Sequence, residues 1–181
     1  MEARGAADGR EIGVGGLSRS ELMSQLVSSG VLLNVHAETL LDNGVFDHQP
    51  PRVITLAERS VADLGLADGA TLLTIFQIAQ QQGLALCPPD TGPYLRLALG
   101  DQGDAPDAVM TSGRAPTASL TVGSAPLEEG DEYPKGFYLR AVTGQKWLRG
   151  YRCDEEHVWS ADDRFVFCLP PDEPGATSGS W

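Results

Sequence analysis

In the second half of the chain, leucine alternates with ring-bearing and arginine side chains, a pattern typical of half-buried strands. Successive side chains of a strand point to opposite faces, so the leucine in the middle of a triplet lies opposite its two neighbours. The pattern predicts strands over residues 94–99, 137–142, 146–152 and 164–169. It is clearest in three triplets, Tyr94-Leu95-Arg96, Tyr138-Leu139-Arg140 and Trp147-Leu148-Arg149.

The last two triplets are predicted to form a hairpin, because Thr143-Gly144 between them suits a tight turn. A two-residue loop pairs Tyr138 with Arg149 and Arg140 with Trp147. One face would then carry the predicted ligand-binding side chains Tyr138, Arg140, Trp147, Arg149 and Tyr151, and Arg96 of the earlier strand is expected to join them. A slip of one residue would reverse every side chain, so this prediction depends on the loop length.

The first half of the chain has the spacing of amphipathic helices. Ser18 and Glu21 are spaced as a capping box, which predicts a helix from there to Gly30. A more apolar helix is predicted over residues 71–82 and a strand over 53–56. Helices first and strands second predict an α+β fold, with N-terminal helices packed on a C-terminal, mainly antiparallel β-sheet.

The length of 181 residues suits one domain. Residues 1–16, rich in glycine, alanine and charge, are predicted to be a flexible leader, and residues 170–181 a disordered tail. Residues 17–169 would form a single α+β domain, with a helical part at about 17–90 and a β part at about 92–169.

A formal net charge of -12 opposes contact with a phosphate backbone, so no nucleic-acid partner is expected. No apolar run approaches the ~18 residues of a membrane span, and the first residues lack a secretory pattern, so no membrane partner is expected either. The cysteines, Cys87, Cys153 and Cys168, are odd in number and lack CxxC spacing, which predicts a reducing, cytoplasmic location.

The arginines and rings of the hairpin allow more than one interpretation. As a structural ladder, each arginine–ring pair would stabilise the sheet by ~0.5–1 kcal/mol. As a binding face, the planar guanidinium groups suit carboxylate, sulfate or phosphate. Tryptophan, tyrosine and arginine are also the usual anchors of protein interfaces, so an assembly with itself or with a partner is equally open.

Signals of catalysis are weaker. His36 and Glu38 offer acid–base groups, although the Asn34–His36 segment precedes a helix and we favour a capping role there. Cys153 and His157 place a thiol and an imidazole four positions apart, which fits no closed zinc site, and His157 is expected to anchor its loop by a hydrogen bond. No phosphate-binding loop, HExxH or GxSxG is present, so neither a metal nor a cofactor is predicted.

Strings spread over residues 18–169 resemble a group of small uncharacterised bacterial proteins. They include Leu33-Asn34-Val35-His36-Ala37-Glu38-Thr39-Leu40, Gly92-Pro93-Tyr94-Leu95-Arg96-Leu97 and Trp147-Leu148-Arg149-Gly150-Tyr151. Some members of the group carry a helicase label, which the missing phosphate-binding loop does not support. The resemblance implies no catalytic residues, but it does imply that the histidine, arginine and tryptophan pattern is a family trait.

These observations favour a non-catalytic binding or accessory protein that acts with a partner protein or an anionic small molecule. The alternative is a small enzyme or enzyme subunit of bacterial specialised metabolism. In that case His36, Glu38, Cys153 and His157 would be the candidate catalytic groups.

Overall fold

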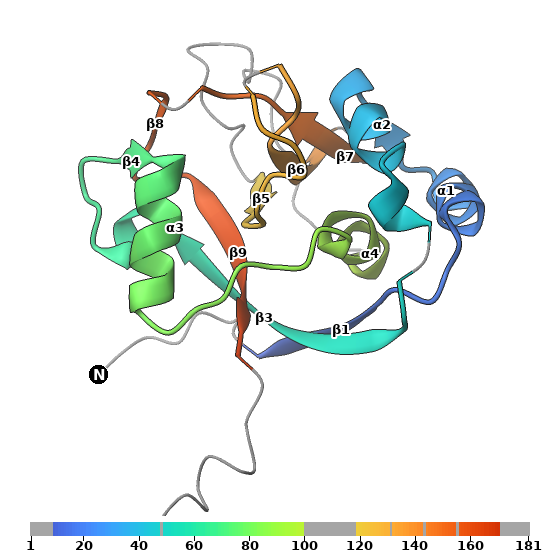
Figure 1. Cartoon of the computed structure of the whole chain (residues 1–181), viewed down its shortest axis with the longest axis horizontal. Helices are drawn as coiled ribbons and strands as arrows, with labels where there is room; N and C mark the ends of the chain where they lie inside the picture. Colours follow the sequence, from blue (N-terminus) through green and yellow to red (C-terminus); the bar gives the residue numbers. More distant parts are fainter. Residues whose placement is uncertain are drawn as a thin grey trace, which may run out of the picture.

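The computed structural model describes residues 9–47, 49–99, 119–130, 132–142, 144–154 and 156–170. Within these residues, α-helices and a curled, mostly antiparallel sheet make up an α+β fold (Figure 1). No helix among them has the length and apolar character needed to cross a membrane.

Seven strands form the main sheet, which draws on both halves of the chain. Their spatial order is β1 (Arg10–Val14), β3 (Arg52–Ser60), β9 (Arg164–Leu169), β5 (Leu120–Val122), β6 (Gly136–Val142), β7 (Gln145–Tyr151) and β2 (Leu32–Leu33). Neighbouring strands run antiparallel except in the pairs β5–β9 and β2–β7. A separate small sheet joins β4 (Ala70–Thr71) to β8 (Val158–Trp159). Because β1 and β3 precede residue 92, the predicted arrangement of N-terminal helices on a C-terminal sheet is not confirmed.

Part of the predicted flexible leader is a strand. Residues 10–14 form β1, which pairs antiparallel with β3. Ile12 and Val14 alternate with exposed neighbours and bury their side chains in the core. This alternation involves only two apolar residues in a segment rich in glycine, so the sequence did not reveal the strand. Residues 1–8 of the predicted leader, and 171–181 of the predicted tail, lie outside the described residues.

The helices divide between the two faces of the sheet. Three of them, α1 (Arg19–Ser28), α2 (Val35–Leu41) and α4 (Thr91–Ala98), pack with the leucines of β6 and β7 in a first core. The sheet curls around α4 (Figure 1). On the opposite face, α3 (Leu72–Gln81) packs on the phenylalanines of β9 in a second core. Short 3-10 helices, Gly44–Phe46 and Ala62–Leu64, complete the described elements.

The predicted strand at residues 94–99 is wrong, because this segment belongs to helix α4. Pro93 lies in the first helical turn, where no backbone N–H is required. Leu95 and Arg96 are both buried, which a helix wedged inside a curled sheet achieves and a half-exposed strand does not. Close approach to β6 also fixes Gly92, because a Cβ there would lie 2.6 Å from Cδ2 of Phe137.

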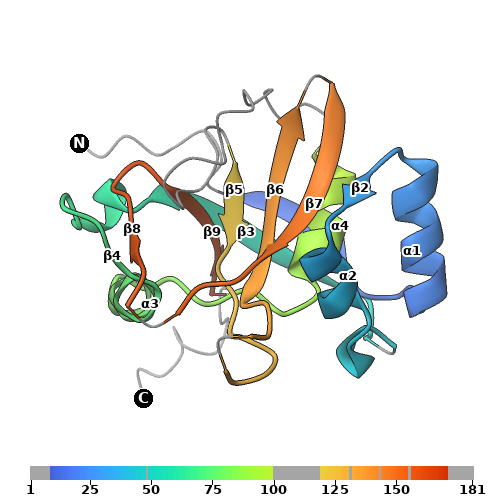
Figure 2. The same ribbon diagram turned by 90° about the horizontal axis from the view of Figure 1, so that it is seen from above.

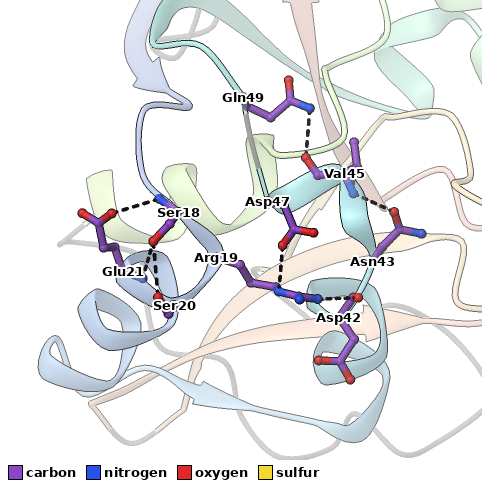
Figure 3. Close-up of polar contacts among 9 residues, drawn as sticks. All are labelled: Ser18, Arg19, Ser20, Glu21, Asp42, Asn43, Val45, Asp47 and Gln49. Carbon is purple, nitrogen blue, oxygen red and sulfur yellow. Dashed lines mark hydrogen bonds and ion pairs between the residues drawn. The ribbon is translucent and has the colours of Figure 1, made fainter.

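Two helix predictions are confirmed. Helix α1 begins after Ser18 with the predicted capping box, in which the Glu21 N–H donates to Oγ of Ser18 at 3.2 Å and the Ser18 N–H donates to the Glu21 carboxylate at 3.3 Å (Figure 3). Helix α3 begins after Thr71, within the range expected from its apolar stripe. Both starts are set by local polar groups, which is why the sequence reveals them.

Candidate functional site

The β6–β7 hairpin has the predicted register. Tyr138 lies opposite Arg149 and Arg140 opposite Trp147, while Gly136 faces Tyr151. We call the side chains that share this side of the sheet the hairpin face; they are Tyr138, Arg140, Trp147, Arg149 and Tyr151. Thr143, in the predicted turn, lies outside the described residues.

The hairpin face is a mixture of buried and half-buried side chains. Arg140 is 1% exposed and Tyr151 is 8% exposed, whereas Tyr138, Trp147 and Arg149 remain partly accessible. Tyr138 and Tyr151 pack in the second core beside the rings of β8 and β9. Arg140 and Tyr151 are therefore part of the packed interior, and Tyr138, Trp147 and Arg149 keep some exposure to solvent.

Arg96 does not join this face. It projects from α4 on the opposite side of the sheet, and its side chain is fully buried. Its guanidinium donates to the carbonyl oxygens of Leu99 at 2.7 Å, Arg140 at 3.3 Å and Trp147 at 3.4 Å. Burial lowers the pKa of Arg96 to about 10. Arg96 thus supports the hairpin from behind through the backbone of two paired residues.

Tyr138 has two arginines as neighbours on the hairpin face: Arg149 lies opposite it on β7, and Arg140 follows two positions later on β6. The Arg149 guanidinium carbon lies 4.9 Å from the ring centroid of Trp147, within the range of a cation–π contact. Burial raises the pKa of Tyr138, and the positive charges of Arg149 and Arg140 partly oppose that rise. The partly accessible side chains of the face, Tyr138, Trp147 and Arg149, therefore combine a phenol, an indole ring and a guanidinium charge, which suits a planar or anionic group.

Several buried donors on or beside the hairpin face have no acceptor among the described residues. They are Nε of Arg149, the hydroxyl of Tyr151 and the indole N–H of Trp159. The rings of Tyr151 and Trp159 meet edge to face at 5.3 Å, so these two donors lie in one aromatic cluster. Burial also raises the pKa of Tyr151, which keeps its hydroxyl protonated as a donor.

A buried donor without an acceptor costs about 1–3 kcal/mol, so native proteins rarely keep one without a water or a ligand to accept its hydrogen. Three such donors lie on the side of the sheet that carries the hairpin face. Sequence reasoning missed Trp159, although its alternation with His157 after the hairpin was a usable signal.

Asn34 ties helix α2 to the end of β7. Its Oδ1 accepts from the N–H of Ala37 at 2.8 Å and from the N–H of Gly150 at 2.9 Å, while its Nδ2 donates to the Gly150 carbonyl at 3.1 Å. The capping role favoured from the sequence is confirmed. Figure 2 shows the result, with β2 and α2 lying along β7.

His36 lies on the other side of the sheet from the hairpin face, because Gly150 alternates with Arg149 and Tyr151 along β7. Its backbone packs against Gly150, where a Cβ would lie 2.6 Å from the His36 carbonyl carbon. Burial lowers the pKa of His36, and the charges of Arg152 and Arg149 lower it further. Glu38 is exposed on the same helix.

Cys153 and His157 contact the second core separately. The His157 N–H donates to the Asp154 carbonyl at 3.4 Å, and its ring meets Trp159 edge to face at 5.3 Å, so a backbone hydrogen bond and an aromatic contact together anchor this loop. Cys153 is half-buried against the same core. Among the described residues, no group of three or more histidine, cysteine, aspartate or glutamate side chains is arranged to hold a metal ion.

A shallow hollow beside α1 is a weaker candidate for a binding site. Its lining includes Ser18, Glu21 and Asp47, whose polar groups are already engaged locally (Figure 3). Ser18 and Glu21 form the capping box, and Asp47 pairs with Nε of Arg19 at 3.1 Å. We therefore place the candidate site on the hairpin face.

Comparison with known proteins gives no similarity that bears on this site. No family model matches the chain, and no curated protein or solved structure is significantly similar to it.

Proposed function

We propose that this protein is a non-catalytic binding or accessory protein whose hairpin face takes an anionic, acceptor-rich small molecule. The observation that carries the proposal is the set of buried donors on Arg149, Tyr151 and Trp159, for which the described residues offer no acceptor. A carboxylate, sulfate or phosphate supplies several acceptor oxygens at once and offsets guanidinium charge.

The charge of the chain makes this choice specific. A protein with a formal net charge of -12 repels anions over most of its surface. Anion binding therefore requires a local gathering of positive groups, and the hairpin face holds two arginines in adjacent strands. The cation–π contact of Arg149 with Trp147 holds one guanidinium in place before the ligand arrives.

We favour a small molecule over a protein partner as the ligand. The side chains of Tyr151 and Trp159 are 8% and 5% exposed, so their donors lie beneath the surface. A compact anion is the kind of ligand that could approach such donors. A flat protein surface would contact only the half-buried side chains Tyr138, Trp147 and Arg149. A protein partner remains the second form of the proposal, with Trp147 and Arg149 as its anchors.

The proposal also assigns the protein to the bacterial cytoplasm, in keeping with its free cysteines and the resemblance noted above. Nucleic acid is not expected as a ligand. Residues 60–82 contain a single α-helix, α3, and therefore do not form a helix-turn-helix.

The test is a thermal-shift titration with sodium phosphate, sodium sulfate and sodium benzoate, each compared with sodium chloride at equal ionic strength. At least one of the three anions is expected to raise the melting temperature in a saturable way. Arg149→Gln should abolish that shift. Arg10→Gln is the matched control, because it removes the same charge from an exposed position on β1. Equal shifts in both variants, or no saturable shift in the parent protein, would contradict the proposal.

One observation favours the alternative of a small enzyme. Burial and the charges of Arg152 and Arg149 lower the pKa of His36, which favours the neutral imidazole that can accept a proton. If the bound anion were also turned over, His36→Gln would leave the thermal shift intact and remove turnover. A His36→Gln variant that loses the shift itself would assign His36 to binding or to structure.

A further inference from the structure

Two cysteines that are far apart in the sequence meet in the first core. Ala85 and Cys168 form an antiparallel bridge, with both N–H to carbonyl distances at 2.8 Å. Cys87 lies two positions after Ala85, so alternation directs its side chain to the same face as that of Cys168. The Cys87 N–H, which donates to the Gly123 carbonyl at 2.7 Å, fixes this segment against β5 as well.

The side chains of Cys87 and Cys168 contact each other through a hydrogen bond. The Cys87 sulfur also lies 3.6 Å from the Val166 carbonyl oxygen. Both cysteines are buried, at 4% and 6% exposed.

The surroundings give the two thiols different reactivity. The hydrogen bond from Cys87 and the nearby charge of Arg52 lower the pKa of Cys168, against the effect of burial. The same hydrogen bond and burial raise the pKa of Cys87. Cys168 is therefore the thiol that reacts first with an oxidant, and Cys87 is the neighbour that resolves the product.

We propose that Cys87 and Cys168 are a modification site at which a peroxide forms an intramolecular disulfide between β9 and the segment that leads into α4. The Cys168 thiolate attacks one peroxide oxygen, the O–O bond breaks, and the released hydroxide takes a proton to give water. The sulfur of Cys87 then attacks the Cys168 sulfenic acid, the S–O bond breaks, and a second water leaves. Two electrons and two protons pass from the thiols to hydrogen peroxide, so the step balances.

Cys153 provides an internal control. It is half-buried against the second core, on the other side of the sheet from the pair. The proposal is independent of the proposed function, because neither cysteine belongs to the hairpin face. Its consequence is mechanical, since the bond would fasten the chain before α4 to the sheet that curls around α4.

The experiment treats the full, folded chain with hydrogen peroxide, then blocks remaining thiols with iodoacetamide in denaturant and maps the peptides by mass spectrometry. The expected result is a linked peptide pair containing Cys87 and Cys168, with Cys153 outside the linkage. Cys153→Ser should give the same linked pair, and Cys168→Ala should give none. The Cys153→Ser arm keeps the test decisive even if Cys168→Ala fails to fold. Linkage through Cys153, persistence of both Cys87 and Cys168 as alkylated thiols, or their conversion to sulfinic acids without linkage would overturn the proposal.

Discussion

Asn34 carries more of the connection between helix α2 and the hairpin than its size suggests. Its side chain makes one capping bond to α2 and two bonds to the backbone of Gly150, which lies between Arg149 and Tyr151 on β7. Removing the side chain should therefore loosen the strand that carries half of the hairpin face. Two substitutions separate the contributions, because serine retains a capping oxygen and alanine retains nothing.

The expected magnitudes follow from these three bonds. Asn34→Ser loses both bonds to Gly150 and keeps the cap, so the free energy of unfolding should fall by about 1–3 kcal/mol. Asn34→Ala also loses the cap and should cost ~1 kcal/mol more. Urea unfolding followed by circular dichroism, at unchanged m-value, measures both differences. An Asn34→Ala loss below about 0.5 kcal/mol would refute this reading, because such a value is typical of surface substitutions that touch no special contact.

Three further predictions concern the same region. Gly150→Ala should lower the free energy of unfolding by about 1–3 kcal/mol, because a Cβ would lie 2.6 Å from the His36 backbone. Gly44→Ala is the control, because its Cβ would have only a 3.7 Å contact, and it should stay within ~0.5 kcal/mol of the parent in urea unfolding. His36 has a lower pKa in the folded protein than in the unfolded chain, so the unfolded chain takes up its proton first and stability should fall as pH drops through about 6.5. His36→Gln should flatten that slope, and an unchanged slope would contradict the assignment. Tyr151→Phe should leave the stability of the free protein unchanged or raise it by up to about 1 kcal/mol, because the lost hydroxyl has no acceptor among the described residues. The same substitution should weaken the anion-induced thermal shift.

The parts of the fold that the sequence predicts are those decided by neighbouring residues. The hairpin register followed from a tight turn and strict alternation, and the pairing of Tyr138 with Arg149 is confirmed. The start of α1 followed from Ser18 and Glu21, which satisfy each other's backbone. Such local signals act over a few residues and need no knowledge of the rest of the chain.

The errors arose where distant contacts decide the structure. Leu95 and Leu97 alternate as in a strand, yet the segment is a helix because it fills the space inside the curled sheet. No local signal showed that Gly92 had to lie against Phe137. The same holds for the depth of Arg140, which depends on how the rest of the fold packs around β6. The residues of the two hairpin strands that share one face were therefore predictable, whereas the place of Arg96, the presence of Trp159 and the burial of Arg140 and Tyr151 were not.

The central claim is that an anion reaches the buried donors beside the hairpin face. The most direct measurement is a ¹⁵N NMR titration that follows the side-chain resonances of Arg149 Nε–H and Trp159 Nε1–H while sodium phosphate, sulfate or benzoate is added against a chloride control. The account predicts saturable shifts of both resonances at the same ligand concentration. Shifts confined to other regions, such as the hollow beside α1, or no saturable shift with any of the three anions, would contradict it.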